Sequence, residues 1–248
     1  MSHPPNNEPF NTTRWSIVLA AGRDQNTESS AGALETLCQS YWHPLYFYIR
    51  RRSNSLHEAQ DMTQAFFERL LENRTLANAD PDRGRFRAFL LTACKRFLAN
   101  EWKKENAIKR GGGRRALSLD FDAAEDRYAI EAEESLTPEI VYEQQWAITL
   151  LGSVLEQLAS EFDSRGKREQ FEVLKPFLSG SRSLTHAEAA AKLDMQEGAV
   201  KVAAHRMRTR YRELIRAEIS QTVESPEHID DEIRRLFEVL AEKRGNSL

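Results

Sequence analysis

Apolar residues recur at helical spacing along most of this chain, and no segment shows the two-residue alternation typical of a surface strand. In residues 32–52, for example, Leu34, Leu37 and Tyr41 lie three or four positions apart. Pro44 should bend or divide that helix, because proline removes a backbone donor. The pattern predicts an all-α protein, with helices over 13–22, 32–52, 57–74, 86–110, 137–162, 167–178, 186–193 and 197–216, and a last one that begins at Ser225-Pro226.

Changes in composition divide these helices into two small helical bundles joined by a flexible linker. Residues 1–12 are expected to be disordered, and 13–110 carry enough amphipathic helix for a first bundle. The "GGGRR" stretch and the acidic run after it make 111–136 the predicted linker. The second bundle is predicted over 137–220, followed by a helical extension over 221–248.

Charge is strongly segregated, although the net charge of the 248 residues is only −3. Residues 84–115 carry a balance of +8 and residues 197–216 a balance of +4, whereas residues 120–139 carry −7. Two basic segments on either side of an acidic one indicate two contacts with a polyanion. Solvated helix faces are the alternative interpretation.

Several function classes find no support in the sequence. No apolar run approaches the roughly 20 residues of a membrane helix, and the first residues lack a secretory signal, so a cytoplasmic location is expected. Cys38 and Cys94 fall in apolar helical patterns and are interpreted as small buried hydrophobes. The chain has no HExxH spacing, phosphate-binding glycine loop or cysteine cluster, so neither an enzyme, a metal site nor a cofactor is predicted.

Residues 184–216, "LTHAEAAAKLDMQEGAVKVAAHRMRTRYRELIR", have the pattern of a helix-turn-helix. Thr185 can cap a first helix whose alanines allow close crossing, "DMQE" supplies the turn, and Val200, Ala204 and Met207 continue the core. In this motif the second helix enters the major groove of duplex DNA. A purely structural helical hairpin has a similar pattern.

Three motifs together resemble the extracytoplasmic-function (ECF) sigma factors of the sigma-70 family. "HAEAAAKLDMQEGAVKVAAHRMRTRYREL" resembles their region-four recognition motif, "EAQDMTQAFFERLLE" their region-two polymerase-docking helix, and "RGRFRAFLLTACKRFLANEWKKE" the adjoining helix that opens and reads the minus-ten element. The resemblance spans roughly residues 30–218. It implies a transcription initiation factor that binds core RNA polymerase, directs it to promoter DNA through the minus-ten and minus-thirty-five elements, and aids melting. An anti-sigma factor and a regulatory kinase are further candidate partners.

The resemblance implies that the helix over 57–74 binds the polymerase. Gln60 and Ala65 depart from the family pattern, because these positions are commonly acidic. Phosphorylation of Thr63 is one hypothesis for supplying the missing negative charge, and the alternative is an ordinary helix-surface residue. The candidate polymerase-binding residues are Glu58, Asp61, Gln64, Phe67 and Glu68.

The resemblance also assigns two sets of DNA contacts. Trp102 could stack on a base or simply cover the core, and Glu197 could accept a hydrogen bond from cytosine or act as a favourable first-turn acid. The candidate minus-ten residues are Asn78, Asp80, Arg83, Arg87, Lys95, Arg96, Asn100, Trp102 and Lys103. The candidate minus-thirty-five residues are Glu197, Gly198, Lys201, Val202, His205, Arg206, Arg208 and Arg210.

Three alternatives stay open at the level of sequence. The protein could be a helix-turn-helix regulator that acts without being a polymerase subunit. The acidic linker could thread into the polymerase cleft or serve as a solvated spacer. The tail beyond residue 220 could pack on the region-four bundle, self-associate or bind a regulator.

Overall fold

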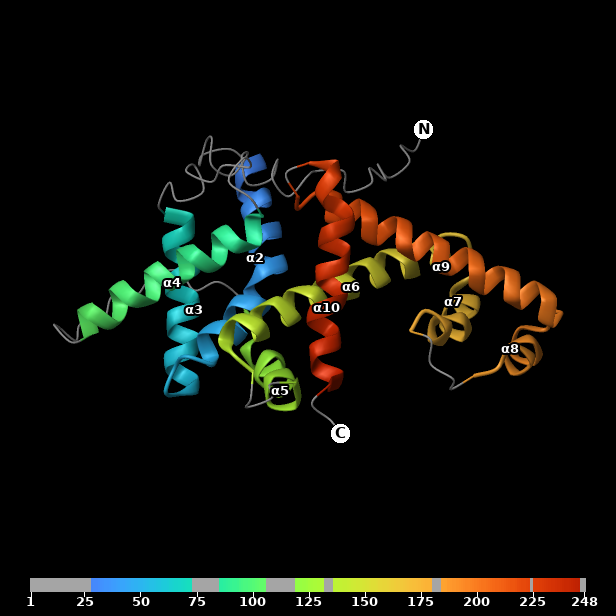
Figure 1. Cartoon of the computed structure of the whole chain (residues 1–248), viewed down its shortest axis with the longest axis horizontal. Coiled ribbons are helices and arrows are strands. Elements are labelled where there is room, and N and C mark those ends of the chain that lie inside the picture. Colours follow the sequence, from blue (N-terminus) through green and yellow to red (C-terminus); the bar gives the residue numbers. More distant parts are fainter. Residues whose placement is uncertain are drawn as a thin grey trace, which may run out of the picture. The chain divides into compact units, whose positions relative to one another are not determined.

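The computed structural model describes residues 28–72, 85–105, 119–131, 136–179, 184–223 and 225–245, and every regular element in these ranges is helical (Figure 1). This confirms the predicted all-α class. The predicted helix over 13–22 lies outside the described residues. The chain divides into two compact units. Unit 1 comprises Met1–Ala147 with Ser220–Leu248, and unit 2 comprises Ile148–Ile219.

Unit 1 is built around α2, whose second half is buried on nearly all sides. Leu45, Phe47 and Ile49 are fully buried, and the helix runs through Pro44 without being divided. Unit 1 contains the following elements: α2 (Glu28–Arg50), α3 (Leu56–Glu72), α4 (Phe86–Glu105), α5 (Phe121–Glu131), the first part of α6 (Pro138–Asp163), η4 (Pro226–His228) and α10 (Ile229–Gly245).

Aromatic side chains hold α2, α3 and α4 together. The Tyr41 ring of α2 meets Phe86 of α4 edge-on, with centroids 5.3 Å apart. Phe66 of α3 meets Phe97 of α4 at 5.6 Å. Such edge-to-face pairs add to the free energy gained by burying the rings. The start of α4 is thereby fixed on the core of unit 1.

Helix α5 corrects the prediction of a flexible linker over 111–136 for the part that it covers, Phe121–Glu131. It packs on α2, where the Tyr46 hydroxyl donates to the Glu125 carboxylate at 2.6 Å and Arg50 donates to both oxygens at 3.1 and 3.2 Å. The Phe121 ring lies 5.3 Å from that of Tyr46. Composition suggested a spacer because acidic residues dominate, but one of these acids, Glu125, has basic and hydroxyl partners on α2. Residues 111–118 and 132–135 lie outside the described part of the chain.

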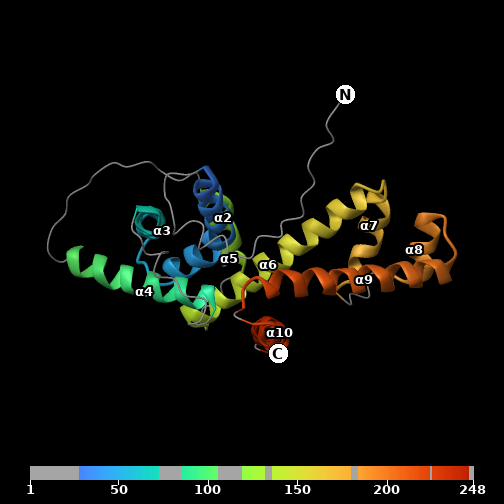
Figure 2. The ribbon, with the colours of Figure 1, turned by 90° about the horizontal axis from the view of Figure 1, so that it is seen from above.

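Helix α10 corrects the predicted domain boundaries. The extension was expected to pack on the second bundle, self-associate or bind a regulator, and instead α10 belongs to unit 1 together with α6 up to Ala147. The Gln144 amide of α6 donates to the Val239 carbonyl of α10 at 3.0 Å. Helix α10 crosses α6 in Figure 1 and is seen end-on next to it in Figure 2. Leu236 and Val239 are buried there. The apolar stripe of α10 therefore finds its cover on unit 1.

Unit 2 contains the predicted helix-turn-helix. Its core is formed by Leu158, Phe171, Leu174, Ala189 and Val200, which are all almost fully buried. Besides the end of α6, the unit contains α7 (Arg168–Leu174), η3 (Lys175–Phe177), α8 (His186–Leu193) and α9 (Glu197–Ser220).

Local sequence signals fix both ends of α8. The Thr185 hydroxyl accepts from the Glu188 amide at 3.2 Å, and the Thr185 amide donates to the Glu188 carboxylate at 2.7 Å, which is a complete capping box. Asp194 ends the helix in the left-handed region with φ of 48°. Aspartate tolerates this conformation better than most residues, so the tight turn between α8 and α9 needs no glycine.

Thr185→Ala should destabilise α8 by about 1 kcal/mol, because the first turn loses its hydroxyl acceptor. Backbone amides of α8 should then exchange with solvent roughly five times faster in a hydrogen-exchange measurement. Thr209→Ala, at an exposed position within α9, is the matched control and should change exchange little. Equal exchange in α8 of wild type and T185A would contradict the role of the cap.

Candidate nucleic-acid interface

One face of α9 is open to solvent and carries most of the predicted minus-thirty-five residues. Glu197, Gly198, Lys201, Val202, His205 and Arg206 are all exposed. Their spacing of three or four residues places them on adjoining rows of the helix. Val202 is 49% exposed, which is unusual for a β-branched aliphatic side chain. An exposed apolar residue between basic ones suits contact with a groove that offers both methyl groups and phosphates.

Part of the charge on this face is neutralised locally. The Lys201 ammonium lies 2.7 Å from the Glu197 carboxylate one turn earlier, and this hydrogen bond lowers the pKa of Glu197. No ion pair joins Arg206 to another of the described residues, so its guanidinium is available to bind a phosphate or a base. Arg208 is half-buried and donates to the Ala204 carbonyl at 3.4 Å.

Arg210 has a structural partner in unit 2. Its guanidinium makes a two-pronged contact with Glu161 of α6, at 2.7 and 2.9 Å, and a third bond to Glu213 at 3.0 Å. These bonds raise the pKa of Arg210 and lower that of Glu161. The side chain of Arg210 is still 44% exposed. A DNA phosphate would therefore compete with Glu161 for this arginine.

Beside α9 lies a hollow of about 580 Å³ that sequence reasoning missed. Its apolar wall includes Phe162 and Met207, and its cations include Arg165, Lys167 and Arg206. Arg165 and Lys167 flank Gly166, which has a φ of 67° and forms the turn after α6. The string "SRGKR" was a sequence signal for a helix end rich in cations. The hollow extends the basic surface of unit 2 beyond α9.

The distal part of α4 carries the second basic surface. Arg96, Asn100 and Lys103 are exposed, and Lys95 is paired with Glu139 of α6 at 2.8 Å. Trp102 is half-buried, and the Arg52 guanidinium lies 5.4 Å from its ring centroid. The structure thus brings five of the predicted minus-ten residues onto the distal part of α4. Asn78, Asp80 and Arg83 lie outside the described residues.

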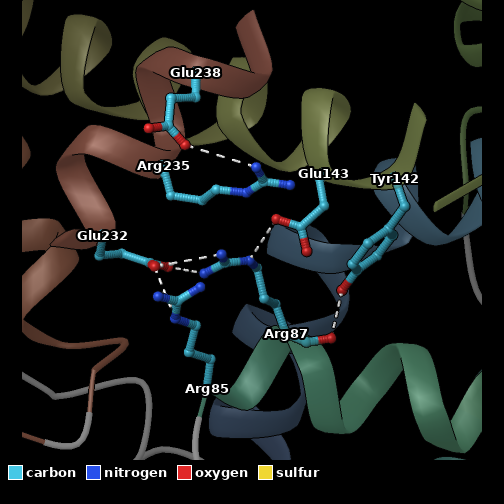
Figure 3. Close-up of polar contacts among 7 residues, drawn as sticks. All are labelled: Arg85, Arg87, Tyr142, Glu143, Glu232, Arg235 and Glu238. Carbon is cyan, nitrogen blue, oxygen red and sulfur yellow. Dashed lines mark hydrogen bonds and ion pairs between the residues drawn. The ribbon is translucent and has the colours of Figure 1, made fainter. Parts of the chain in front are cut away.

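Arg87 corrects the predicted set of minus-ten contacts. Its side chain is only 3% exposed and is held inside unit 1 (Figure 3). Its Nε donates to Glu143 of α6 at 2.9 Å, its Nη1 is paired with Glu232 of α10, and the guanidinium lies 4.1 Å from the Trp146 ring centroid. Burial lowers the pKa of Arg87 despite these partners. Arg87 is therefore a core residue in this structure and presents no surface to DNA.

The predicted polymerase-binding helix also needs one correction. Asp61 is exposed and Gln64 and Glu68 are half-exposed on α3, whereas Phe67 is 1% exposed and belongs to the core. The Glu58 carboxylate accepts from the Asn54 amide at 2.7 Å. Glu58 thus helps to begin α3, and it remains partly accessible.

Thr63 is neither a helix-surface residue nor an accessible phosphorylation site. Its side chain is fully buried, and its hydroxyl donates to the Ala59 carbonyl at 2.7 Å. A phosphate would bring a charge of about −1.5 to −2 into the core of unit 1. Both interpretations of Thr63 from the sequence are therefore wrong in this fold.

Two further findings bear on the chemistry of the molecule. Among the described residues, no three histidine, cysteine or acidic side chains are grouped so that they could hold a metal ion. Within the same part of the chain, no helix is both long and apolar enough to cross a membrane.

Glu161→Gln should destabilise the protein by roughly 0.5–1 kcal/mol at pH 7, the value of a partly exposed ion pair. Because Arg210 lowers the pKa of Glu161 from its ordinary value of 4.5, this stability is present above that value. It is lost as pH falls through the lower pKa of the folded state. Urea denaturation followed by circular dichroism at pH 7, 5 and 3.5 should show the difference from wild type shrinking below about pH 4.5. The exposed Glu156 offers the control E156Q, and a difference that is equal at all three pH values would contradict the assignment.

A protein-family comparison assigns most of the chain. The family described as ECF sigma factor matches residues 25–220, which is well over half of the 248 residues. Curated proteins and solved structures gave no match. The matched segment includes α2 to α9 and ends before α10 begins.

Proposed function

Because this chain belongs to the ECF sigma factor family, we propose that each of its two units performs a different part of transcription initiation. Members of this family are non-enzymatic factors that bind RNA polymerase and promoter DNA. Unit 1 docks on core polymerase through α3 and reads the minus-ten element with α4. Unit 2 reads the minus-thirty-five element with α9. The proposal locates the protein in the cytoplasm, with the polymerase.

The observation that carries this proposal is the exposed face of α9. Lys201, Val202, His205 and Arg206 project from the second helix of a capped helix-turn-helix. A helix of this kind fits the major groove with its first turns against base edges. Arg206 can donate two hydrogen bonds to a guanine, which is the commonest specific contact.

The second support is the cationic end of α4. Arg96 and Lys103 make no ion pair with any of the described residues, and both are exposed beside the half-buried Trp102. Single-stranded DNA is held by basic side chains that follow its backbone and by aromatic rings that stack on bases. Trp102 is half-exposed and could offer such a ring without leaving its place against Arg52.

The third support is the acidic and polar surface of α3. Asp61 is exposed, and Glu58 and Glu68 are partly accessible on the same helix. A surface of this charge suits a basic partner, and a regulator that binds DNA alone has no need of it. Gln60 is half-exposed at a position that is commonly acidic in the family, so fewer charges are available for this contact.

The full chain should co-purify with core polymerase from its own organism and should redirect initiation in run-off transcription on a genomic fragment library. The physical reason is that the two basic surfaces bind only DNA. The docking helix α3 is needed to bring the catalytic centre of the polymerase to the promoter. Duplex promoter fragments should be bound tightly only when core polymerase is present. Tight, sequence-specific binding by the free protein, without any effect on polymerase, would favour the helix-turn-helix regulator instead.

Arg206→Ala should lower run-off transcription from the strongest promoter roughly tenfold, the cost of losing one two-pronged base contact. Arg212→Ala is the matched control, since Arg212 is an exposed arginine on another face of α9. Its loss should change output much less. If both variants lose output equally, Arg206 acts through general charge and the assigned base contact is wrong.

A further inference from the structure

Helix α10 carries a carboxylate in the middle of its buried stripe. Ile229, Glu232, Leu236 and Val239 recur three and four residues apart, and all four side chains are buried. Glu232 is fully buried although its side chain is a carboxyl group. A carboxylate at such a position costs desolvation free energy and is tolerated only when it is paired. Its partners therefore indicate what this position does.

Two arginines from the start of α4 meet on Glu232 (Figure 3). Arg85 Nε lies 2.8 Å from one carboxylate oxygen and Arg87 Nη1 is paired with the other. Two guanidinium groups that converge on one anion provide the donors that also bind a phosphate. The first turn of α4 begins beside them, and the positive end of a helix favours an anion there.

The charge balance of the cluster depends on α10. Arg85 and Arg87 carry two positive charges, and α6 supplies only Glu143, which bonds Arg87 at 2.9 Å. Without Glu232 the cluster would carry an excess positive charge. The Arg85 side chain is already 40% exposed, so this charge would be accessible from solvent. The uncovered site would attract another anion.

We propose that α10 is an intramolecular competitor for DNA, with Glu232 occupying a two-arginine phosphate site at the start of α4. This rests on the proposed function, which brings α4 to promoter DNA. When α10 is displaced, Arg85 and Arg87 bind a backbone phosphate of the nucleic acid. While α10 is in place, the affinity of the free protein for single-stranded DNA is lower.

Two observations favour a displaceable helix over a permanent part of the fold. The match to the family ends at residue 220, so α10 lies outside the segment that the family pattern covers. Glu232 of α10 is held at the start of α4 by ion pairs with the buried Arg87 and the partly exposed Arg85, and desolvation of the carboxylate offsets much of their attraction. A phosphate offers the same arginines a comparable partner, so the remaining cost of displacing α10 is the loss of its apolar contacts, such as those of Leu236 and Val239.

Hydrogen exchange on the wild-type full chain tests this directly, with and without a thirty-nucleotide oligothymidine as the probe. Amides in α10 should exchange at least about threefold faster in the complex, because DNA displaces the helix and raises the population of its open state. Amides at the start of α4 should be protected. Binding of the oligonucleotide with α10 exchange unchanged or slowed would overturn the proposal.

A variant series gives the second arm. Glu232→Gln should bind the same oligonucleotide roughly five- to tenfold more tightly, the change expected for one recovered charge-assisted contact. Its affinity should also fall more steeply with salt, with the slope of log affinity against log salt larger by about 0.7 for each added phosphate contact. Adding Arg85→Ala in the E232Q background should return the affinity to that of wild type.

Glu238→Gln is the matched control, because Glu238 is a 53% exposed acid of the same helix that pairs only at 3.7 Å with Arg235. It should leave the affinity close to wild type. Circular dichroism and a thermal melt show whether E232Q is folded at the assay temperature. Folded E232Q with unchanged or weaker DNA binding would overturn the proposal, and if E232Q is unfolded the exchange experiment on wild type decides.

Failure of this proposal can be told apart from failure of the proposed function. Co-purification with core polymerase and redirected initiation test the latter and do not require α10 to move. A wild-type protein that directs initiation while α10 stays protected on DNA would remain a sigma factor whose tail is a fixed part of unit 1.

Discussion

The burial of Arg87 is the constraint on which the assembly of unit 1 depends. A guanidinium that is 3% exposed would cost several kcal/mol if it were unpaired. Its two carboxylates come from α6 and α10, which are 56 and 145 residues away along the chain. Tyr142 adds a hydrogen bond from its hydroxyl to the Arg87 carbonyl at 3.0 Å. Arg87 therefore links helices α4, α6 and α10 within unit 1.

The helices themselves could be predicted from the sequence, because each signal acts within a few residues. Thr185 and Glu188 form the capping box that their spacing indicates, and Asp194 takes the left-handed conformation at the turn. The apolar stripes of α3, α4, α6 and α10 lie close to the predicted ranges. The exposed face of α9 also follows from helical spacing alone, since its inward residues Val200, Ala204 and Met207 are buried as expected.

The misassigned residues have a common physical feature, which is that each polar side chain lies in phase with an apolar stripe. Arg87 stands three residues before Leu90 and seven before Cys94, both of which are buried. Thr63 stands three residues before Phe66 and four residues before Phe67, and all three side chains lie on the buried side of α3. Residue type suggested a surface role, whereas position in the helix indicated the core. Position in the helix decides burial where the polar group has a partner inside the core. Such a partner can lie far away along the chain, so local sequence patterns do not predict it.

The segregation of charge has two physical consequences. Acids of the intervening and later segments neutralise several basic residues within the molecule, as Glu139 does for Lys95 and Glu161 for Arg210. Both of these pairs are partly exposed, so exchanging the acid for a phosphate costs only about 0–1 kcal/mol each. Exchanging the acid at Arg87 is a different matter, because the helix that carries Glu232 must leave as well. The cations of unit 1 thus fall into two groups. The exposed ones on α4 can bind nucleic acid in the present fold, whereas Arg85 and Arg87 can do so only after α10 has moved.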